Sequence, residues 1–427
     1  MNFVNSVKAL TSQASRPQNA AMKTIAVLGT LDTKGPEHGY VAELIRKRGH
    51  QTLLIDTGTL DPPSLKPDIT RDEVASATSL NLAELRARQD RGESVTAMAN
   101  AAAALLLKLF LEERIHGVIS LGGGGGTAIG TTAMRALPIG FPKLMVSTLA
   151  AGNVAPYLGT KDIVMFPSIV DVNGLNRISR VLLARAAGAI CGMVEAEPPA
   201  TAEKPIIAAS MFGNTTQCVN TAKKILEDSG YEVLVFHATG TGGRIMESLI
   251  ESGLIAGVLD VTTTEWADEL VGGILGAGPN RLDAAAHADI PAVIAPGCLD
   301  MVNFGERSSV PSKFSDRLFY QHNPQVTLMR TTAQECAALG NIIAEKVNAY
   351  TAPVTVLLPL KGVSVISAAG GSFHDPAADA ALFQALKHHA KAGTRILEFD
   401  TTINDDHFAQ ACAHELLENV SRHHSPS

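Results

Sequence analysis

Five consecutive glycines, Gly122–Gly126, follow the apolar run 117–121 and precede a segment from Thr127 that can form a helix. Because glycine has no Cβ, such a turn reaches backbone dihedrals closed to other residues and lets a ligand approach the main chain. The turn also exposes N–H groups at a helix N-terminus, where the helix dipole favours an anion. A flexible surface loop is the alternative interpretation. We predict a phosphate-binding turn.

The identity of the phosphate ligand is less well defined by this turn. A P-loop ends in Lys followed by Ser or Thr, whereas here the last glycine is followed directly by Thr127. A dinucleotide fingerprint can be laid on Gly123, Gly125 and Ala128. However, residues 127–161 contain no Asp or Glu, and that fingerprint requires a carboxylate about twenty residues further on to bind the ribose. The pattern therefore argues against NAD at this turn.

Polar residues also follow the other strands expected in the first half of the chain. Lys34 could neutralise phosphate oxygens, and Asp32 could hold a cation or a hydroxyl group. Asp56 has the position that binds an adenosine ribose in doubly wound folds, although both aspartates could instead cap helices or stabilise turns. The residues expected to bind a nucleotide are Gly29, Thr30, Asp32, Thr33, Lys34, Asp56, Gly122, Gly123, Gly124, Gly125, Gly126, Thr127, Ser147 and Thr148.

The second half of the chain offers a separate set of polar residues. Residues 236–244 repeat the order of strand, glycine-rich turn and helix, and Arg330 could clamp a carboxylate or a phosphate. The residues expected to bind a substrate are Thr239, Gly240, Thr241, Gly242, Gly243, Arg244, Cys298, Asp300, His322, Asn323, Arg330 and Lys361. The residues expected to take part in catalysis are Lys34, Glu265, Arg330 and His237. Structural roles are the alternative for His237 and His322, and no lowered pKa of Cys298 can be read from the sequence.

The elements that position these residues predict a duplicated α/β protein. Residues 23–54 align with residues 204–235 without a gap, and the apolar segments 117–119 and 142–146 match 257–259 and 291–295 in the same order. Residues 163–166 can further be paired with 327–330. We predict two similar Rossmann-like, doubly wound domains with mostly parallel sheets and a cleft between them, where open α/β sheets bind ligands.

The expected boundaries follow from this alignment. Residues 1–22 form a disordered extension, residues 23–200 form domain 1 with an insertion at 58–100, and residues 204–422 form domain 2. The second domain adds strands at 354–360 and 395–400.

Composition restricts the possible partners and the compartment. The formal net charge of −7 over 427 residues gives no general attraction to nucleic acid or to an anionic membrane. The extension lacks the apolar region of a secretory signal, and we see no apolar run of the length that a membrane helix needs. The five cysteines are dispersed without a C-x-x-C pair, which fits a reducing cytoplasm.

Several motifs in order also resemble a known family. These are the segments 25–35, 120–127, 237–243, 262–265 and 359–364. Together they are similar to the UPF0261 family, whose members resemble the N-terminal, ATP-binding half of the tomato resistance protein Tm-1. The resemblance covers residues 23 to about 420. It implies two Rossmann-like domains, ATP binding and a homodimer. In the plant protein this half is fused to a TIM barrel resembling phosphoenolpyruvate hydrolases, so a separate barrel protein is an expected partner.

We therefore expect a cytoplasmic ATP-binding protein, and the leading hypothesis is an enzyme that uses ATP and Mg²⁺ on a small anionic metabolite. In this hypothesis Asp32 or Glu265 holds the metal, and catalysis consists mostly of positioning and charge neutralisation. One alternative is a non-catalytic dimer or assembly component that ATP stabilises. Another is an enzyme of sugar acids or similar metabolites without nucleotide turnover.

Overall fold

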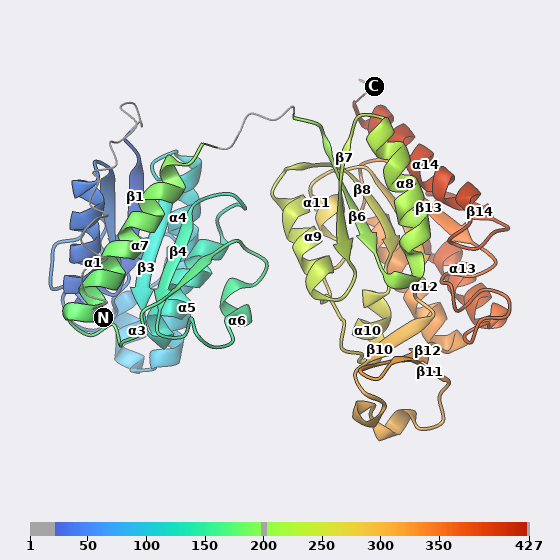
Figure 1. Cartoon of the computed structure of the whole chain (residues 1–427), viewed down its shortest axis with the longest axis horizontal. Coiled ribbons are helices and arrows are strands. Elements are labelled where there is room, and N and C mark those ends of the chain that lie inside the picture. Colours follow the sequence, from blue (N-terminus) through green and yellow to red (C-terminus); the bar gives the residue numbers. More distant parts are fainter. Residues whose placement is uncertain (1–21, 198–202, 425–427) are drawn as a thin grey trace, which may run out of the picture. The chain divides into compact units, whose positions relative to one another are not determined.

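The computed structural model describes residues 22–197 and 203–424. The chain divides into two compact units at residues 200 and 201, which we call domain 1 and domain 2 (Figure 1). The predicted disordered extension, apart from Met22, and the residues 198–202 at the predicted boundary lie outside the described residues.

Domain 1 is a five-stranded parallel sheet covered by helices on both faces. Its strand order is β2-β1-β3-β4-β5, and every pair is parallel. The strands are β1 (Thr24–Gly29), β2 (Gln51–Asp56), β3 (Gly117–Gly122), β4 (Lys143–Ser147) and β5 (Val164–Pro167). Helices α1 (Leu31–Lys47) and α7 (Arg177–Glu195) cover one face. The other face carries α2 (Arg71–Ser76), α3 (Leu82–Arg88), α4 (Arg91–Leu111) and α5 (Gly124–Arg135), and a short α6 (Ala155–Leu158) lies beside α5.

The buried sequence of β1 shows why helices cover both faces. Ile25 and Val27 pack in the core under α1 and α7, whereas Ala26 and Leu28 pack in the core under α4 and α5. Because side chains alternate between the two faces of a strand, a continuous apolar run needs cover on both sides. The doubly wound architecture predicted for this half is confirmed.

Helix α4 is the one described helix that is long and apolar enough to cross a membrane by length and composition. This finding differs from the expectation that no apolar run has the length of a membrane helix. In the structure α4 packs against α5 and α2, and residues such as Met98, Leu106 and Leu109 are fully buried in the core of domain 1. A core helix passes the same test, so this finding is weak evidence for a membrane span.

Domain 2 contains a six-stranded parallel sheet and a separate three-stranded antiparallel sheet. The strand orders are β14-β13-β9-β8-β6-β7 and β10-β12-β11. The parallel strands are β6 (Ile206–Met211), β7 (Glu232–His237), β8 (Ile255–Thr262), β9 (Ala292–Gly297), β13 (Val354–Pro359) and β14 (Arg395–Phe399). The antiparallel strands are β10 (Met301–Phe304), β11 (Phe319–Asn323) and β12 (Val326–Arg330).

Helices again cover both faces of the large sheet. Helices α8 (Thr216–Asp228) and α14 (Asp406–His424) pack on one face. The other face is covered by α9 (Thr241–Glu251), α10 (Glu265–Val271), α11 (Ala284–His287), α12 (Ala333–Asn348) and α13 (Pro376–His389). Short 3₁₀ turns occur at η1 (Gly213–Thr215), η2 (Arg307–Ser309) and η3 (Ser312–Phe314).

The duplication is visible in the strand orders. The order β2-β1-β3-β4-β5 of domain 1 corresponds to β7-β6-β8-β9-β13 of domain 2, as the sequence alignment predicted for the first four strands. The pairing of residues 163–166 with 327–330 was wrong, because β12 pairs antiparallel with β10 and β11 in the separate sheet. Strand β13 takes the position of β5, beside β9.

Candidate functional site

The glycine-rich turn of domain 1 is shorter than the sequence suggested, because the helix begins inside it. Gly122 ends β3, Gly123 is the N-cap in an extended conformation, and α5 starts at Gly124. A Cβ on Gly122 would lie 2.7 Å from the Cα of Gly126, so the turn closes only with glycine there. The N-cap provides no side-chain hydrogen bond. The first N–H groups of α5 therefore lack both a preceding helical turn and a capping side chain.

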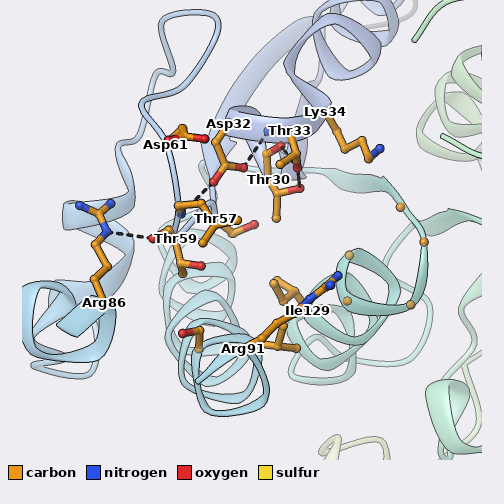
Figure 2. Close-up of a pocket in the computed structure, with 18 of the residues that line it drawn as sticks. Thr30, Asp32, Thr33, Lys34, Thr57, Thr59, Asp61, Arg86, Arg91 and Ile129 are labelled. Carbon is orange, nitrogen blue, oxygen red and sulfur yellow. Dashed lines mark hydrogen bonds between the residues drawn. The ribbon is translucent and has the colours of Figure 1, made fainter. Parts of the chain in front are cut away.

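These N–H groups border a cavity of about 910 Å³ in domain 1 (Figure 2). The glycine turn and the first turn of α1 form one part of its wall, and the segment after β2 and the start of α4 form another. The lining residues are Thr30, Asp32, Thr33, Lys34, Thr57, Thr59, Leu60, Asp61, Arg86, Gln89, Asp90, Arg91, Ser94, Val95, Gly122, Gly123, Gly124, Gly125, Gly126, Ile129 and Asp171. The structure thus brings together the two predicted nucleotide-binding segments, 30–34 and 122–126.

Two basic side chains lie near the turn. One is Lys34, which lines the cavity. Arg91, the first residue of α4, has its Nη2 4.0 Å from the point that a Cβ on Gly125 would occupy. Figure 2 shows the Arg91 side chain reaching toward the start of α5. Helix N-terminal N–H groups with a lysine and an arginine nearby are a suitable arrangement for a polyphosphate.

Asp32 and Asp56 have different environments. Asp32 lines the cavity, and its oxygens accept hydrogen bonds from the N–H groups of Leu60 (3.0 Å) and Thr33 (2.8 Å). Asp56 is buried and does not line the cavity. Its carboxylate accepts the N–H groups of Leu31 and Gly58 and the Nε of Arg71 at 2.7 Å. The expectation that Asp56 binds a ribose is therefore not met, because this carboxylate joins the ends of β1 and β2 through main-chain groups and Arg71.

Four further residues of the predicted nucleotide-binding set do not line the cavity and have structural contacts instead. A Cβ on Gly29 would lie 1.9 Å from Nε2 of the buried His38, so glycine is needed for packing there. The hydroxyl groups of Thr127 and Ser147 are hydrogen-bonded at 2.7 Å, and both residues are buried. Thr148 donates its N–H to the Gly122 carbonyl at 3.2 Å.

The insertion at 58–100 contributes to the cavity, which the sequence motifs did not indicate. Nine cavity residues come from it: Thr59, Leu60, Asp61, Arg86, Gln89, Asp90, Arg91, Ser94 and Val95. Asp90 caps α4 by accepting the Glu93 N–H at 2.9 Å, which fixes the start of the helix that carries Arg91. The capping pattern Asp-x-x-Glu ahead of an apolar run was a readable signal. Thr57, immediately before the insertion, was also missed: it is buried, lines the cavity, and its hydroxyl group has no partner among the described residues.

The glycine-rich turn of domain 2 is occupied by the protein itself. The carboxylate of Glu265 accepts the N–H groups of Gly240 (2.6 Å) and Gly243 (3.1 Å) at the start of α9. Its second oxygen accepts the Nε of Arg281 at 2.6 Å, and Glu265 is fully buried. The expectations that Glu265 is catalytic or holds a metal, and that this turn binds a substrate, are therefore corrected. The built-in carboxylate takes the place that an anionic ligand would need.

Arg281, which the sequence did not single out, balances a buried acidic cluster. Its guanidinium group contacts Asp260 at 2.6 and 2.7 Å, Glu265 at 2.6 Å and Glu247 at 2.9 Å, and the residue is 1% exposed. Burial by itself would lower the pKa of Arg281, but the three carboxylates raise it well above its usual value. Burial raises the pKa of Glu247, and the charge of Arg281 opposes that shift.

The guanidinium group of Arg330 is also held by hydrogen bonds within domain 2. Its nitrogens donate to the Phe373 carbonyl (2.9 Å), the Thr331 hydroxyl (2.9 Å) and the Asp379 carboxylate (2.6 Å), and the residue is buried. It cannot clamp a substrate without losing these bonds, which corrects the predicted catalytic role. Cys298 is fully buried, and burial raises the pKa of its thiol well above the usual value, so it is not an activated nucleophile.

Asp300 lies beside Arg330, and its titration provides a test of this buried pair. It is fully buried, Ser364 donates to its Oδ2 at 2.8 Å, and its Oδ1 has no partner among the described residues. Burial raises the pKa of Asp300 to about 7, against the opposing charge of Arg330.

The pH dependence of stability follows from this shift. Between the ordinary pKa of 3.8 and about 7, the folded protein keeps a proton on Asp300 that the unfolded chain releases. Stability from this group is therefore lost as pH rises through that window, by up to about 1.4 kcal/mol per pH unit. We expect Asp300→Asn to flatten this part of the pH profile of urea unfolding and to be more stable than the parent at pH 8. An unchanged profile would contradict the assignment.

The remaining predicted residues of domain 2 are mostly at its surface. His237 is exposed at the end of β7, with its ring 5.9 Å from that of Phe212. The exposed Lys361 pairs with Asp400 at 2.9 Å. Arg244 donates to the Gly276 carbonyl and the Thr241 hydroxyl, and Thr239 donates to the His237 carbonyl. A Cβ on Gly242 would lie 1.8 Å from that same carbonyl. His322 and Asn323 are exposed on β11 of the antiparallel sheet.

Within residues 22–197 and 203–424, no group of three His, Cys, Asp or Glu side chains is placed to hold a metal ion.

The fold and the cavity define a protein with two Rossmann-like domains, of which the first has an open glycine-rich turn. The chain belongs to the UPF0261 family. Residues 23–199 match the model of the N-terminal domain of this uncharacterised protein family, and residues 204–420 match the model of its C-terminal domain. The resemblance read from the sequence motifs is thereby confirmed.

Similar proteins occur in bacteria and in a plant. A UPF0261 protein of Clostridium tetani is 50% identical over 94% of this chain and 100% of its own length. One from Rhizobium meliloti is 48% identical over 91% of this chain and 97% of its own. The ToMV resistance protein Tm-1(GCR237) of Solanum lycopersicum is 38% identical over 96% of this chain, which spans 56% of the plant protein.

Among solved structures, a UDP-N-acetylglucosamine 2-epimerase from Rickettsia bellii aligns with 64% of this chain and 78% of its own. It is 14% identical with a TM-score of 0.22, so the likeness is not evidence for a shared function.

Proposed function

We propose that domain 1 binds ATP, with the triphosphate at the start of α5 between Lys34 and Arg91. The observation that supports this most directly is the uncapped helix N-terminus of Gly124–Gly126 on the wall of a 910 Å³ cavity. Its dipole and free N–H groups favour an anion, and the two basic side chains add charge. The volume lies at the upper end of the range for small-molecule sites, which leaves room for a nucleotide and a small second ligand. ATP is the nucleotide that the family resemblance implies.

Magnesium would enter with the nucleotide. This ion usually keeps several waters and is held by substrate phosphates and one or two carboxylates. Asp32 and Asp61 both line the cavity and could supply such a carboxylate, whereas Glu265 is committed to Arg281 and the α9 turn. The metal would neutralise phosphate charge and orient the terminal phosphoryl group.

The leading proposal is an enzyme that uses ATP on a small anionic metabolite. Lys34 would act through its charge, and Arg91 would contact the phosphates. Arg330, which was expected to orient the substrate, is bound within domain 2. The metabolite could occupy the part of the cavity formed by the insertion, where Arg86 and Gln89 also lie. We further propose a homodimer that works in the cytoplasm, where the five cysteines, which are buried and form no disulfide in the described part of the chain, would stay reduced.

A second candidate function is favoured by a specific observation. Two of the residues expected to be catalytic, Glu265 and Arg330, are locked in buried ion pairs. ATP could therefore act as a structural ligand that stabilises a homodimer or an assembly with a separate TIM-barrel protein. ATP turnover in the presence of a candidate acid would favour the enzyme, and tight binding without turnover would favour the structural role.

The test of ATP binding uses two substitutions at one glycine. A Cβ on Gly124 would meet nothing within 4 Å, so a side chain fits there without disturbing the turn. We expect Gly124→Asp to weaken Mg-ATP binding by at least 100-fold in isothermal titration, because its carboxylate faces the phosphates at close range. Gly124→Ala adds a methyl group without charge and should bind within a few-fold of the parent.

Two controls make the result specific. Gly192 lies on the exposed side of α7, also with nothing within 4 Å of a Cβ, and Gly192→Asp should bind normally. Each variant should retain the circular dichroism spectrum of the parent. Failure of the parent to bind Mg-ATP, or equal binding by Gly124→Asp, would refute the proposed site.

A further inference from the structure

Thr57, the first residue after β2, carries a buried hydroxyl group without a partner. The residue is 1% exposed, and its Oγ1 has no hydrogen-bond partner among the described residues. Thr57 also lines the large cavity of domain 1 (Figure 2). A hydroxyl group that has lost its hydration is costly unless it forms a hydrogen bond within the folded protein or with a ligand. A molecule in the cavity can supply the partner that the protein does not.

The neighbouring polar groups of this wall already have partners. The hydroxyl groups of Thr30 and Thr33 are hydrogen-bonded to each other at 3.0 Å, and the Asp32 carboxylate accepts two main-chain N–H groups. The main chain of Thr57 is fixed as well, because its N–H donates to the Gly29 carbonyl at 2.9 Å. The sheet therefore holds Thr57 at the cavity wall, and its side-chain hydroxyl group is the one left for a ligand among the described residues of this wall.

The order of the strands places Thr57 in one row with the proposed phosphate site. Strand β1 lies between β2 and β3 and pairs parallel with both. Thr57 follows β2, Thr30 follows β1, and the turn Gly122–Gly126 begins at the end of β3. The three positions thus follow each other along the carboxyl edge of the sheet. Because neighbouring strands are about 4.8 Å apart, two strand spacings of about 10 Å in total separate Thr57 from the glycine turn.

The cavity extends from the glycine turn toward β2. Thr57 and residues of the insertion that follows it line the cavity, whereas Ser147 and Thr148, at the end of β4 on the other side of the turn, do not. A nucleotide with its phosphates at the start of α5 would therefore lie across the end of β1. Since the ribose follows the phosphates, it would lie beside the end of β2.

We propose that the hydroxyl group of Thr57 binds a hydroxyl group of the nucleotide's ribose. This inference rests on the proposed ATP site and assigns its selectivity for ribonucleotides over deoxyribonucleotides. Both hydroxyl groups can donate and accept, so they can form a hydrogen bond in either direction. In other doubly wound folds a carboxylate near the end of the second strand binds the ribose. Here that carboxylate, Asp56, is held by Arg71 and main-chain N–H groups, and the next residue supplies the polar group instead.

The test compares the binding of Mg-ATP with that of the magnesium complexes of 2′-deoxy-ATP and 3′-deoxy-ATP by isothermal titration. The parent should bind ATP about tenfold more tightly than the analogue that lacks the recognised hydroxyl group, as expected for the loss of one hydrogen bond. In Thr57→Val this preference should disappear, because ATP binding weakens about tenfold while binding of that analogue stays unchanged. Thr57→Ser keeps a hydroxyl group and should retain the preference.

Thr52→Val is the matched control. Thr52 lies on β2 and its Oγ1 is likewise buried without a partner in the described part of the chain, but it does not line the cavity. Without nucleotide, both valine variants should unfold at the temperature of the parent or above it, because each removes an unpartnered buried hydroxyl group. Thr57→Val alone should change the preference among the three nucleotides, a readout that a purely structural role of Thr57 would not move.

Three results would overturn this role of Thr57 while leaving the ATP site in place. They are equal affinity of the parent for all three nucleotides, a preference for ATP that persists in Thr57→Val, and a lower unfolding temperature of nucleotide-free Thr57→Val than of Thr52→Val. The last result would show that the Thr57 hydroxyl group has its partner inside the protein. A parent that binds none of the three nucleotides would refute the proposed function and this inference together.

Discussion

Replacing Arg281 by methionine is expected to lower the free energy of unfolding of domain 2 by about 3–5 kcal/mol. The substitution keeps most of the volume and removes the cation that contacts Asp260, Glu265 and Glu247. Three buried or nearly buried carboxylates would then lie together without compensation. Removing one partner of a buried ion pair is far more damaging than exchanging the whole group for apolar residues, because the remaining charges have already lost their hydration.

The measurement is urea unfolding followed by the fluorescence of Trp266, the one tryptophan of the chain, which is buried in domain 2. Arg244→Met is the matched control. Arg244 is exposed on α9 and makes two hydrogen bonds, and it forms no ion pair with any other described residue. Its loss should therefore change stability by about 1 kcal/mol or less. If Arg281→Met unfolds at the same urea concentration as the parent, the acidic cluster does not depend on this arginine.

The second large effect is expected for Gly243→Ala. A Cβ on Gly243 would lie 2.1 Å from Oε2 of Glu265, which is held in place by Arg281 and the N–H of Gly240. The added methyl group must either displace the carboxylate or move the start of α9. We expect a loss of about 2–4 kcal/mol in the stability of domain 2, at or above the usual cost of overpacking.

Gly124→Ala provides the comparison, because the same substitution in the turn of domain 1 meets open space. It should leave stability almost unchanged, as measured by calorimetry of both variants. The contrast tests whether the two glycine-rich turns differ as the structure indicates, one open to a ligand and one filled by Glu265. Equal stability of Gly243→Ala and the parent would show that Glu265 does not occupy the α9 turn.

The sequence predicted the architecture of both domains well because apolar periodicity is local information. In runs such as residues 24–28 and 117–121, buried side chains point into the cores on both faces of a parallel sheet. An ungapped repeat of the first segments identified the second domain. The error at β12 has a physical cause. A strand's partner depends on distant segments, and residues 327–330 pair with β10 and β11, which no local pattern specified.

The candidate site was predicted in part for the same reason. Lys34, Asp32 and the glycine turn follow strands of one parallel sheet, so their meeting at its carboxyl edge follows from the fold class. Arg91 could not be placed there, because its position depends on how the insertion packs beside the turn. The N-cap at the start of α4 could be predicted from the sequence, but the orientation of this helix could not.

What the sequence by itself determined is the family, the two doubly wound domains and the glycine turn as a place for an anion. What only the tertiary structure decided is which polar groups remain available to a ligand. Glu265, Arg330 and Asp56 have the residue types of catalytic and binding groups, yet each is buried with its oxygens or nitrogens committed to partners far away in sequence. Burial makes an unpaired charge costly, so the folded chain satisfies these groups internally, and that outcome depends on contacts that only the completed fold creates.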